Sequence, residues 1–216
     1  MVLKRRCVSS KKHAKKKVFS SKSKSADIIQ NLQNARDTRK VSNMAKNSPH
    51  IAILVEDQYQ VLEVWYPLLR LSEQGIKVTT IGTGKKDTYQ SKEGYPILVD
   101  QSIDKVNVRD FDGVIIPGGW APDFLRRYER VINFVKRLYT DGRVVASICH
   151  GGWVLVSAGI VKGNKVTSFY AIKDDLIAAG GIYLDREVVI DKNLVTSRKP
   201  EDLPAFVRAI IKLLDK

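Results

Sequence analysis

The sequence contains two cysteines, and one of them, Cys149, lies in the run RVVASICHGGWVLVSAG at residues 143–159. An apolar run precedes it, and His150, Gly151 and Gly152 follow it directly. Small residues around a nucleophile are typical of the sharp strand-to-helix turn on which hydrolases expose a reactive side chain. Free N–H groups at a helix start favour a thiolate, so the pattern predicts a cysteine of lowered pKa that attacks carbonyl carbon. The alternative is a buried, unreactive cysteine.

A cysteine nucleophile needs a base, and the choice of histidines is narrow. The sequence has three: His13 near the amino terminus, His50 where the apolar pattern begins, and His150. None follows His150, which excludes the Cys…His-x-Glu order of glutamine amidotransferases. His150 is therefore the candidate base, with its ring folded beside the sulfur and oriented by a carboxylate. The alternative is that His150 contributes only its backbone N–H group.

Two carboxylates and two glycines could complete the site. Glu63 lies in the apolar stretch VLEVWYP, where an acid without a partner is costly, so it is expected to bond to the thiol and tune its pKa. Asp123 follows PGGWAP and is the candidate to orient the base. Gly118 and Gly119, with the amide of His150, are expected to form an oxyanion hole. As alternatives, Glu63 could be a solvated helix acid and Asp123 an ordinary first-turn acid.

The elements that position these residues alternate between strand and helix. Short β-branched apolar runs predict strands, 3.6-residue spacing predicts helices, and the alternation predicts a parallel sheet covered on both faces. In such a doubly wound α/β domain, reactive groups gather at the carboxyl ends of the strands. The strands are expected at 51–56, 76–82, 95–103, 113–119, 143–148 and 165–169, with a hairpin at 187–197. Helices are expected at 59–75, at 122–142, after the strand 143–148 up to Gly159, through KDDLIAAGG, and from Pro200.

Charge divides the chain into two parts. Of a formal net charge of +14, residues 1–49 carry 14 Lys or Arg and two acids, and the remaining residues carry 23 and 21. The first part has almost no large apolar residues, so 1–49 is expected to be a disordered basic extension and 50–216 the folded domain. Three interpretations of the extension stay open: a basic arm that touches nucleic acid weakly, a nuclear or organelle targeting signal, or a start assigned upstream of Met44.

The same composition bounds the protein's location. No apolar run approaches the roughly 20 residues that span a bilayer, so no membrane contact is expected. Two cysteines make no disulfide framework, which indicates a reducing compartment. The expected location is the cytoplasm, with nuclear or organelle targeting through the extension left open.

The motifs PGG, SICHG, TSF, IKDDLIAAGG and DKNLVTSRKPEDLPAF together resemble the ThiJ/PfpI superfamily, from about residue 51 to the carboxyl terminus. The resemblance implies a flavodoxin-like fold related to class I glutamine amidotransferases. It implies Cys149 as nucleophile, His150 as its neighbour, Glu63 as the acid that tunes the thiol, and a homodimer or higher oligomer in which Asp123 comes from a second subunit. The activities it implies are removal of glyoxal and methylglyoxal adducts from protein side chains, cofactor-free glyoxalase chemistry, and peptide hydrolysis.

Two positions depart from that pattern. Gly152 replaces a proline common in the family, and Phe169 stands where relatives carry Tyr or His near the sulfur.

The favoured function is a stress-protective cysteine enzyme that acts on small 2-oxoaldehydes or glycated proteins, with no cofactor and no metal. The alternatives are a peptidase or amidohydrolase that uses the same Cys149, and a redox-sensing or chaperone protein without catalysis.

Overall fold

The computed structural model describes residues 48–215. A seven-stranded sheet runs in the order β10-β11-β7-β6-β1-β2-β5, and all neighbours are parallel except the β10–β11 hairpin. The strands are β1 His50–Val55, β2 Lys77–Gly82, β5 Gln101–Ser102, β6 Gly113–Ile116, β7 Val144–Ile148, β10 Val188–Asp191 and β11 Leu194–Ser197. This is the predicted mostly parallel, flavodoxin-like α/β architecture.

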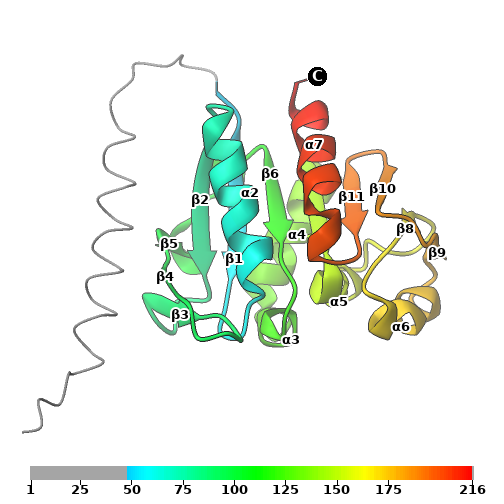
Figure 1. Ribbon diagram of the computed structural model, residues 1–216, viewed down its shortest axis with the longest axis horizontal. Helices are drawn as coiled ribbons and strands as arrows, with labels where there is room; N and C mark the ends of the chain where they lie inside the picture. The colour runs from blue at the N-terminus through cyan, green and yellow to red at the C-terminus, as the bar shows by residue number, and fades with distance from the viewer. Residues whose placement is uncertain (1–47, 216) are drawn as a thin grey trace, which may run out of the picture. The chain divides into compact units, whose positions relative to one another are not determined.

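Helices cover both faces of the sheet. Helices α2 and α7 lie on one face, and α4 and α5 lie on the other (Figure 1). The α-helices are α2 Val61–Glu73, α3 Ala121–Leu125, α4 Glu129–Thr140, α5 Gly152–Ser157, α6 Lys173–Ala178 and α7 Leu203–Leu214. Because both faces are covered, strands β6, β7 and β11 are buried along their full length, which explains their unbroken apolar character.

Short elements fill the connections. Residues 48–215 contain five 3₁₀ turns: η2 Ile103–Lys105, η3 Val108–Asp110, η4 Cys149–Gly151, η5 Tyr170–Ile172 and η6 Pro200–Asp202. Two small ribbons lie outside the main sheet, β3 Thr88–Gln90 with β4 Pro96–Leu98, and β8 Lys165–Val166 with β9 Ile182–Tyr183. Strand β3 was not predicted. None of the described helices combines the length and the apolar character that crossing a membrane requires.

The prediction of one helix over 122–142 is wrong, because the chain breaks between α3 and α4. Tyr128 is extended, with φ −102° and ψ 112°. Leu125 and Val131 are both buried, yet on one continuous helix they would point about 120° apart, since each residue turns the helix by about 100°. The break brings both apolar faces against the fold.

The strand expected at 165–169 is also shorter than predicted, ending at Val166. The backbone N–H of Thr167 donates to the Thr196 side chain at 2.9 Å, so a side chain replaces the next ladder bond. The prediction that 1–49 is a disordered extension concerns residues that lie almost wholly outside the described range, and it stays a prediction.

Candidate active site

Cys149 occupies the sharp turn that the sequence predicted. It follows β7 directly and begins η4, and its φ is +60°, a left-handed conformation that costs free energy for any residue with a Cβ. A Cβ on Gly151 would lie 2.4 Å from the carbonyl oxygen of Ile116, so only glycine allows the helix this close to β6. The fold therefore holds a strained cysteine at the carboxyl end of a central strand, where it is only 8% exposed.

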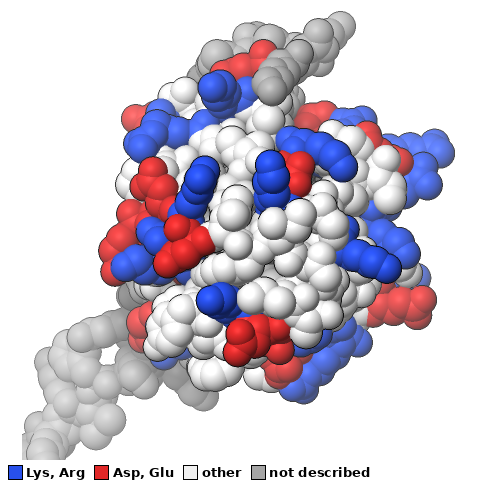
Figure 2. Space-filling model, turned by 90° about the vertical axis from the view of Figure 1, so that its right-hand side faces the viewer, with Lys and Arg blue, Asp and Glu red and all other residues white. Residues whose placement is uncertain are grey.

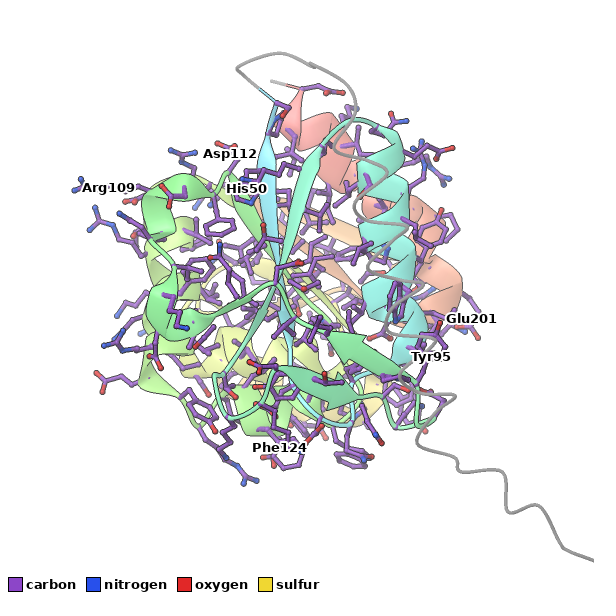
Figure 3. All side chains as sticks on the ribbon, turned by 90° about the vertical axis from the view of Figure 1, so that its left-hand side faces the viewer. His50, Tyr95, Arg109, Asp112, Phe124 and Glu201 are labelled. Carbon is purple, nitrogen blue, oxygen red and sulfur yellow. The ribbon has the colours of Figure 1, made fainter. Side chains whose placement is uncertain are left out.

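His150 folds beside the sulfur, as predicted. Its Nδ1 lies 3.3 Å from Cys149 Sγ. Burial lowers the pKa of His150, and the positive charge of Lys92 lowers it further, so the ring is neutral at pH 7 and able to accept a proton. His50 is excluded as the base, because it lies beside Asp112 at the end of the sheet opposite Phe124 of α3 (Figure 3). His13 lies outside the described residues.

Glu63 is fully buried in the first turn of α2. Its backbone N–H donates to the side chain of Gln60 at 3.0 Å, and its Oε2 accepts the Gly118 amide at 2.6 Å. Its Oε1 has no hydrogen-bond partner of suitable geometry within residues 48–215, while its carboxyl group acts on the Cys149 thiol through both charge and hydrogen bonding. Burial raises the pKa of Glu63 to about 7.

The thiol does not behave as the helix-start rule predicted. The pKa of Cys149 is raised to about 12, first by burial and then by the negative charge of Glu63. The backbone N–H groups of His150 and Gly119 lower it by less. Two buried acidic groups that interact directly cannot easily ionise together, so Glu63 and Cys149 titrate as a pair. The expectation that the helix start alone yields a thiolate is therefore wrong, and the sulfur needs a base at the moment of attack.

The oxyanion hole is smaller than predicted. The Gly118 amide is already bonded to Glu63, so it is not free for a substrate oxygen. The amides of Gly119 and His150 both point toward the sulfur. Gly119 has φ +74°. Two backbone hydrogen bonds fix its loop against the start of α2: Trp120 N donates to Gln58 O at 2.9 Å, and Gln60 N donates to Gly118 O at 3.2 Å. Two N–H donors remain available beside Cys149.

Asp123 is not brought to the histidine within one chain. It lies in α3, its carboxylate pairs with Arg127, and its side chain is 41% exposed. Among residues 48–215, no carboxylate hydrogen-bonds the His150 ring. The prediction that Asp123 reaches the site of a second subunit is not tested by one chain. Nor do any three His, Cys, Asp or Glu side chains of the described part converge on a site that could hold a metal ion.

Three aromatic rings lie around His150, and a fourth, that of Tyr170, packs against Phe169; of these residues, the sequence analysis placed only Phe169 near the sulfur. The ring centroids of Trp120, Trp153 and Phe169 lie 5.7, 5.1 and 5.2 Å from that of His150, and Tyr170 lies 4.5 Å from Phe169. Trp120 directly precedes α3, Trp153 lies in α5, and Phe169 and Tyr170 lie in the segment before α6. The local signals were the position of Trp120 directly after PGG and that of Phe169 in the TSF motif.

The raised pKa of Glu63 makes folding stability depend on pH. The protonated form is favoured in the folded state, so this contribution is complete below about pH 4.5 and lost as the pH rises through about 7. Glu63→Gln should match the wild type near pH 4 and be more stable by up to about 3 kcal/mol at pH 8. Urea unfolding across this range measures the difference. Glu73→Gln, which alters an exposed acid of the same helix, is the control. A Glu63→Gln difference that does not change with pH would contradict the burial argument.

The fold and the site define a class: doubly wound α/β domains that carry a cysteine on a strained turn after a central strand, with histidine next. The chain belongs to the DJ-1/PfpI family, whose model matches residues 49–213. Deglycase PfpI of Pyrococcus furiosus is 43% identical over 164 residues, which are 76% of this chain and 98% of that protein. Protein/nucleic acid deglycase 2 of Escherichia coli is 39% identical over 169 residues, 77% of this chain and 98% of that protein.

A solved structure agrees with this assignment. Drosophila melanogaster DJ-1beta superposes with a TM-score of 0.74 at 28% identity, covering 78% of this chain and 91% of that one. Relatives at about 42% identity that carry the name deglycase support an enzymatic, deglycase-type role for the family to which this chain belongs.

Proposed function

We propose that the protein is a cysteine-dependent deglycase and cofactor-independent glyoxalase that acts on methylglyoxal, glyoxal and their protein adducts, in protection against stress. The observation that carries the proposal is the approach of His150 Nδ1 to Cys149 Sγ at 3.3 Å, on a strained turn beside the buried Glu63. The deglycase names of relatives at about 42% identity support the substrate class.

In the proposed mechanism, the thiol attacks while it loses its proton. The sulfur of Cys149 bonds to the carbonyl carbon, its proton passes to Nδ1 of neutral His150, and the carbonyl electron pair moves to oxygen. The amides of Gly119 and His150 are available to that oxygen once the sulfur is bonded to carbon. His150 then returns the proton, which gives a hemithioacetal. With methylglyoxal, moving the proton of the sulfur-bearing carbon to the adjacent carbon through an enediol turns it into a lactoyl thioester, and water hydrolyses this thioester to lactate and the free Cys149 thiol.

Glu63 has a supporting part in this mechanism. While it keeps its proton, it adds no negative charge next to the developing anion, and it can donate a hydrogen bond from Oε1. Because its pKa is about 7, the protonated form is well populated at neutral pH. We infer that Glu63 holds the sulfur in a reactive orientation and limits the local negative charge.

His150→Gln should lower kcat/KM for methylglyoxal by about 10²- to 10³-fold, since general-base catalysis commonly contributes this much. Glutamine keeps the backbone amide and polarity of the position while removing the base. Lactate formation measures the loss, and circular dichroism checks the fold. His50→Gln, at the far end of the sheet, should keep wild-type turnover, and a His150→Gln enzyme as fast as the wild type would remove the base from the mechanism.

The same pair of groups would also serve a peptidase or amidohydrolase. A sulfur with two N–H donors beside it can form an acyl-thioester and release an amine, so this is the second candidate. Release of ammonia or peptide without methylglyoxal consumption would favour it.

A redox-sensing role has less support, because oxidation follows thiolate character and the pKa of Cys149 is raised.

We propose further that the enzyme is a dimer or higher oligomer in which Asp123 orients the histidine of a second subunit. Its exposed position and the absence of a carboxylate bonded to His150 in the described chain support this. Mixing Asp123→Asn with Cys149→Ser subunits after unfolding and refolding together should restore about a quarter of wild-type turnover, since half the pairs are mixed and one of their two sites is complete. If the mixture stays as inactive as its components, Asp123 does not act across an interface.

Location and nucleic-acid contact stay proposals. We propose a cytoplasmic protein, with any weak nucleic-acid binding confined to the basic extension. Lys, Arg, Asp and Glu are interspersed on the domain face shown in Figure 2, without a large area of one sign. Nucleic-acid binding that weakens steeply with salt in the full chain but is absent after removal of residues 1–47 would support this division.

A further inference from the structure

What we call the aromatic cluster consists of the three rings around His150, those of Trp120, Trp153 and Phe169, and of Tyr170, whose ring packs against Phe169. The proposed reaction gives them no chemical role, since none carries a group that moves a proton in it. Phe169 has no hydroxyl at a position where relatives are expected to carry a proton donor. Three of the cluster's rings nevertheless lie next to the proposed base, His150.

Two members of the aromatic cluster are open to solvent. Trp120 is 55% exposed and Tyr170 is 77% exposed, and both count among the exposed large apolar side chains of the described domain. Large exposed rings that gather beside a reactive group mark a binding surface more often than chance. Among residues 48–215, no Lys or Arg lies over the ring of either residue. Each ring packs against the cluster on one side, Trp120 beside His150 and Tyr170 beside Phe169, and its solvent-exposed part is open to a ligand.

A third member shows which chemistry the cluster accepts. The guanidinium carbon of Arg126 lies 5.9 Å from the Trp153 ring centroid, and its Nε donates to Ser157 Oγ at 2.9 Å. The indole Nε1 of Trp153 donates to Asp175 at 2.8 Å, which places a carboxylate at the margin. A guanidinium thus already packs on this cluster within the chain, next to an acidic side chain.

We propose that the aromatic cluster is a specificity element that binds guanidinium groups and makes arginine-borne adducts the preferred substrates over those of lysine or cysteine. The inference rests on the proposed function for its reaction, and adds which side chain presents the adduct. A guanidinium is flat, keeps its charge, and stacks on aromatic faces, whereas an ammonium is a compact, strongly hydrated charge and a hemithioacetal is neutral. Trp120 and Tyr170 are the residues placed to make this distinction.

Binding measured without turnover tests the inference. In the Cys149→Ser protein, N-acetylarginine amide is expected to bind about tenfold tighter than N-acetyllysine amide, a probe of equal charge, by calorimetry or tryptophan fluorescence. Tyr170→Leu and Trp120→Leu in the same background should each remove most of that preference, and Tyr170→Phe, which keeps the ring, should retain it. Equal affinity for the two amides, or tighter binding of guanosine than of the arginine amide, would overturn the inference.

Turnover separates this inference from the proposed function. With wild-type enzyme, kcat/KM for the methylglyoxal adduct of N-acetylarginine should exceed that for the N-acetyllysine adduct by about tenfold, and Tyr170→Leu should reduce the ratio where Tyr170→Phe does not. If the arginine preference holds in binding but neither adduct is processed, the specificity element stands and the proposed function fails. If both adducts are processed at equal efficiency, the specificity element fails and the function stands.

Discussion

Replacing Cys149 by serine is expected to lower the turnover of methylglyoxal by about 10³-fold or more. Serine fills nearly the same space at the strained turn, but its hydroxyl is a far poorer nucleophile and gives up its proton less readily to the neutral His150. Lactate formation measures the loss, and urea unfolding shows whether the fold is retained.

The control for this substitution is Cys7→Ser, which changes the other cysteine of the sequence and should keep full turnover. If Cys149→Ser retained more than a tenth of wild-type activity while remaining folded, the sulfur would not carry the reaction. Loss of activity in Cys7→Ser alone would contradict the assignment of the nucleophile.

The second large effect concerns the loop that supplies a backbone amide. Gly119→Ala should cost about 3 kcal/mol or more of unfolding free energy, because its new Cβ would meet Gln58 O at 2.3 Å and Gln60 N at 2.7 Å, and backbone atoms cannot move aside cheaply. Displacement of this loop should also move the Gly119 amide away from Cys149 and reduce turnover. Urea unfolding and lactate formation measure the two effects.

Gly142→Ala separates the clash from the backbone conformation. Gly142 has φ +76°, close to the +74° of Gly119, but a Cβ there would meet nothing within 4 Å. It should lose only about 1 kcal/mol, the cost of a left-handed conformation alone, and keep full activity. Equal losses at the two glycines would mean that the close contact with the α2 loop contributes nothing.

The parts of the site that sequence could predict are those fixed by local rules. The glycines after Cys149 indicate a tight turn because few other residues allow helix and strand so close, and a Cβ on Gly151 would indeed meet Ile116 O at 2.4 Å. Glu63 was identifiable because an acid in an apolar stretch needs a partner, and the Gly118 amide is that partner. The alternation of strands and helices predicted the parallel sheet for the same kind of reason.

What the sequence could not predict depends on contacts between distant segments. The break after α3 follows from the direction in which Leu125 and Val131 must point, which periodicity within one run does not reveal. The pKa of Cys149 is raised by burial and by the charge of Glu63, which lies far from Cys149 in the sequence. These two effects outweigh the opposite, local effect of the backbone N–H groups. The aromatic cluster joins three segments, and only the fold brings the rings of Trp120 and Phe169 beside His150.

The central claim is that the sulfur of Cys149 carries the chemistry. The most direct measurement treats the protein with iodoacetamide for increasing times and determines, on the same samples, the fraction of Cys149 alkylated by peptide mass spectrometry and the remaining methylglyoxal turnover. Activity is expected to fall in direct proportion to alkylation of Cys149 and to reach zero when that residue is fully modified, whatever the state of Cys7. Turnover that persists with Cys149 fully alkylated would contradict the account.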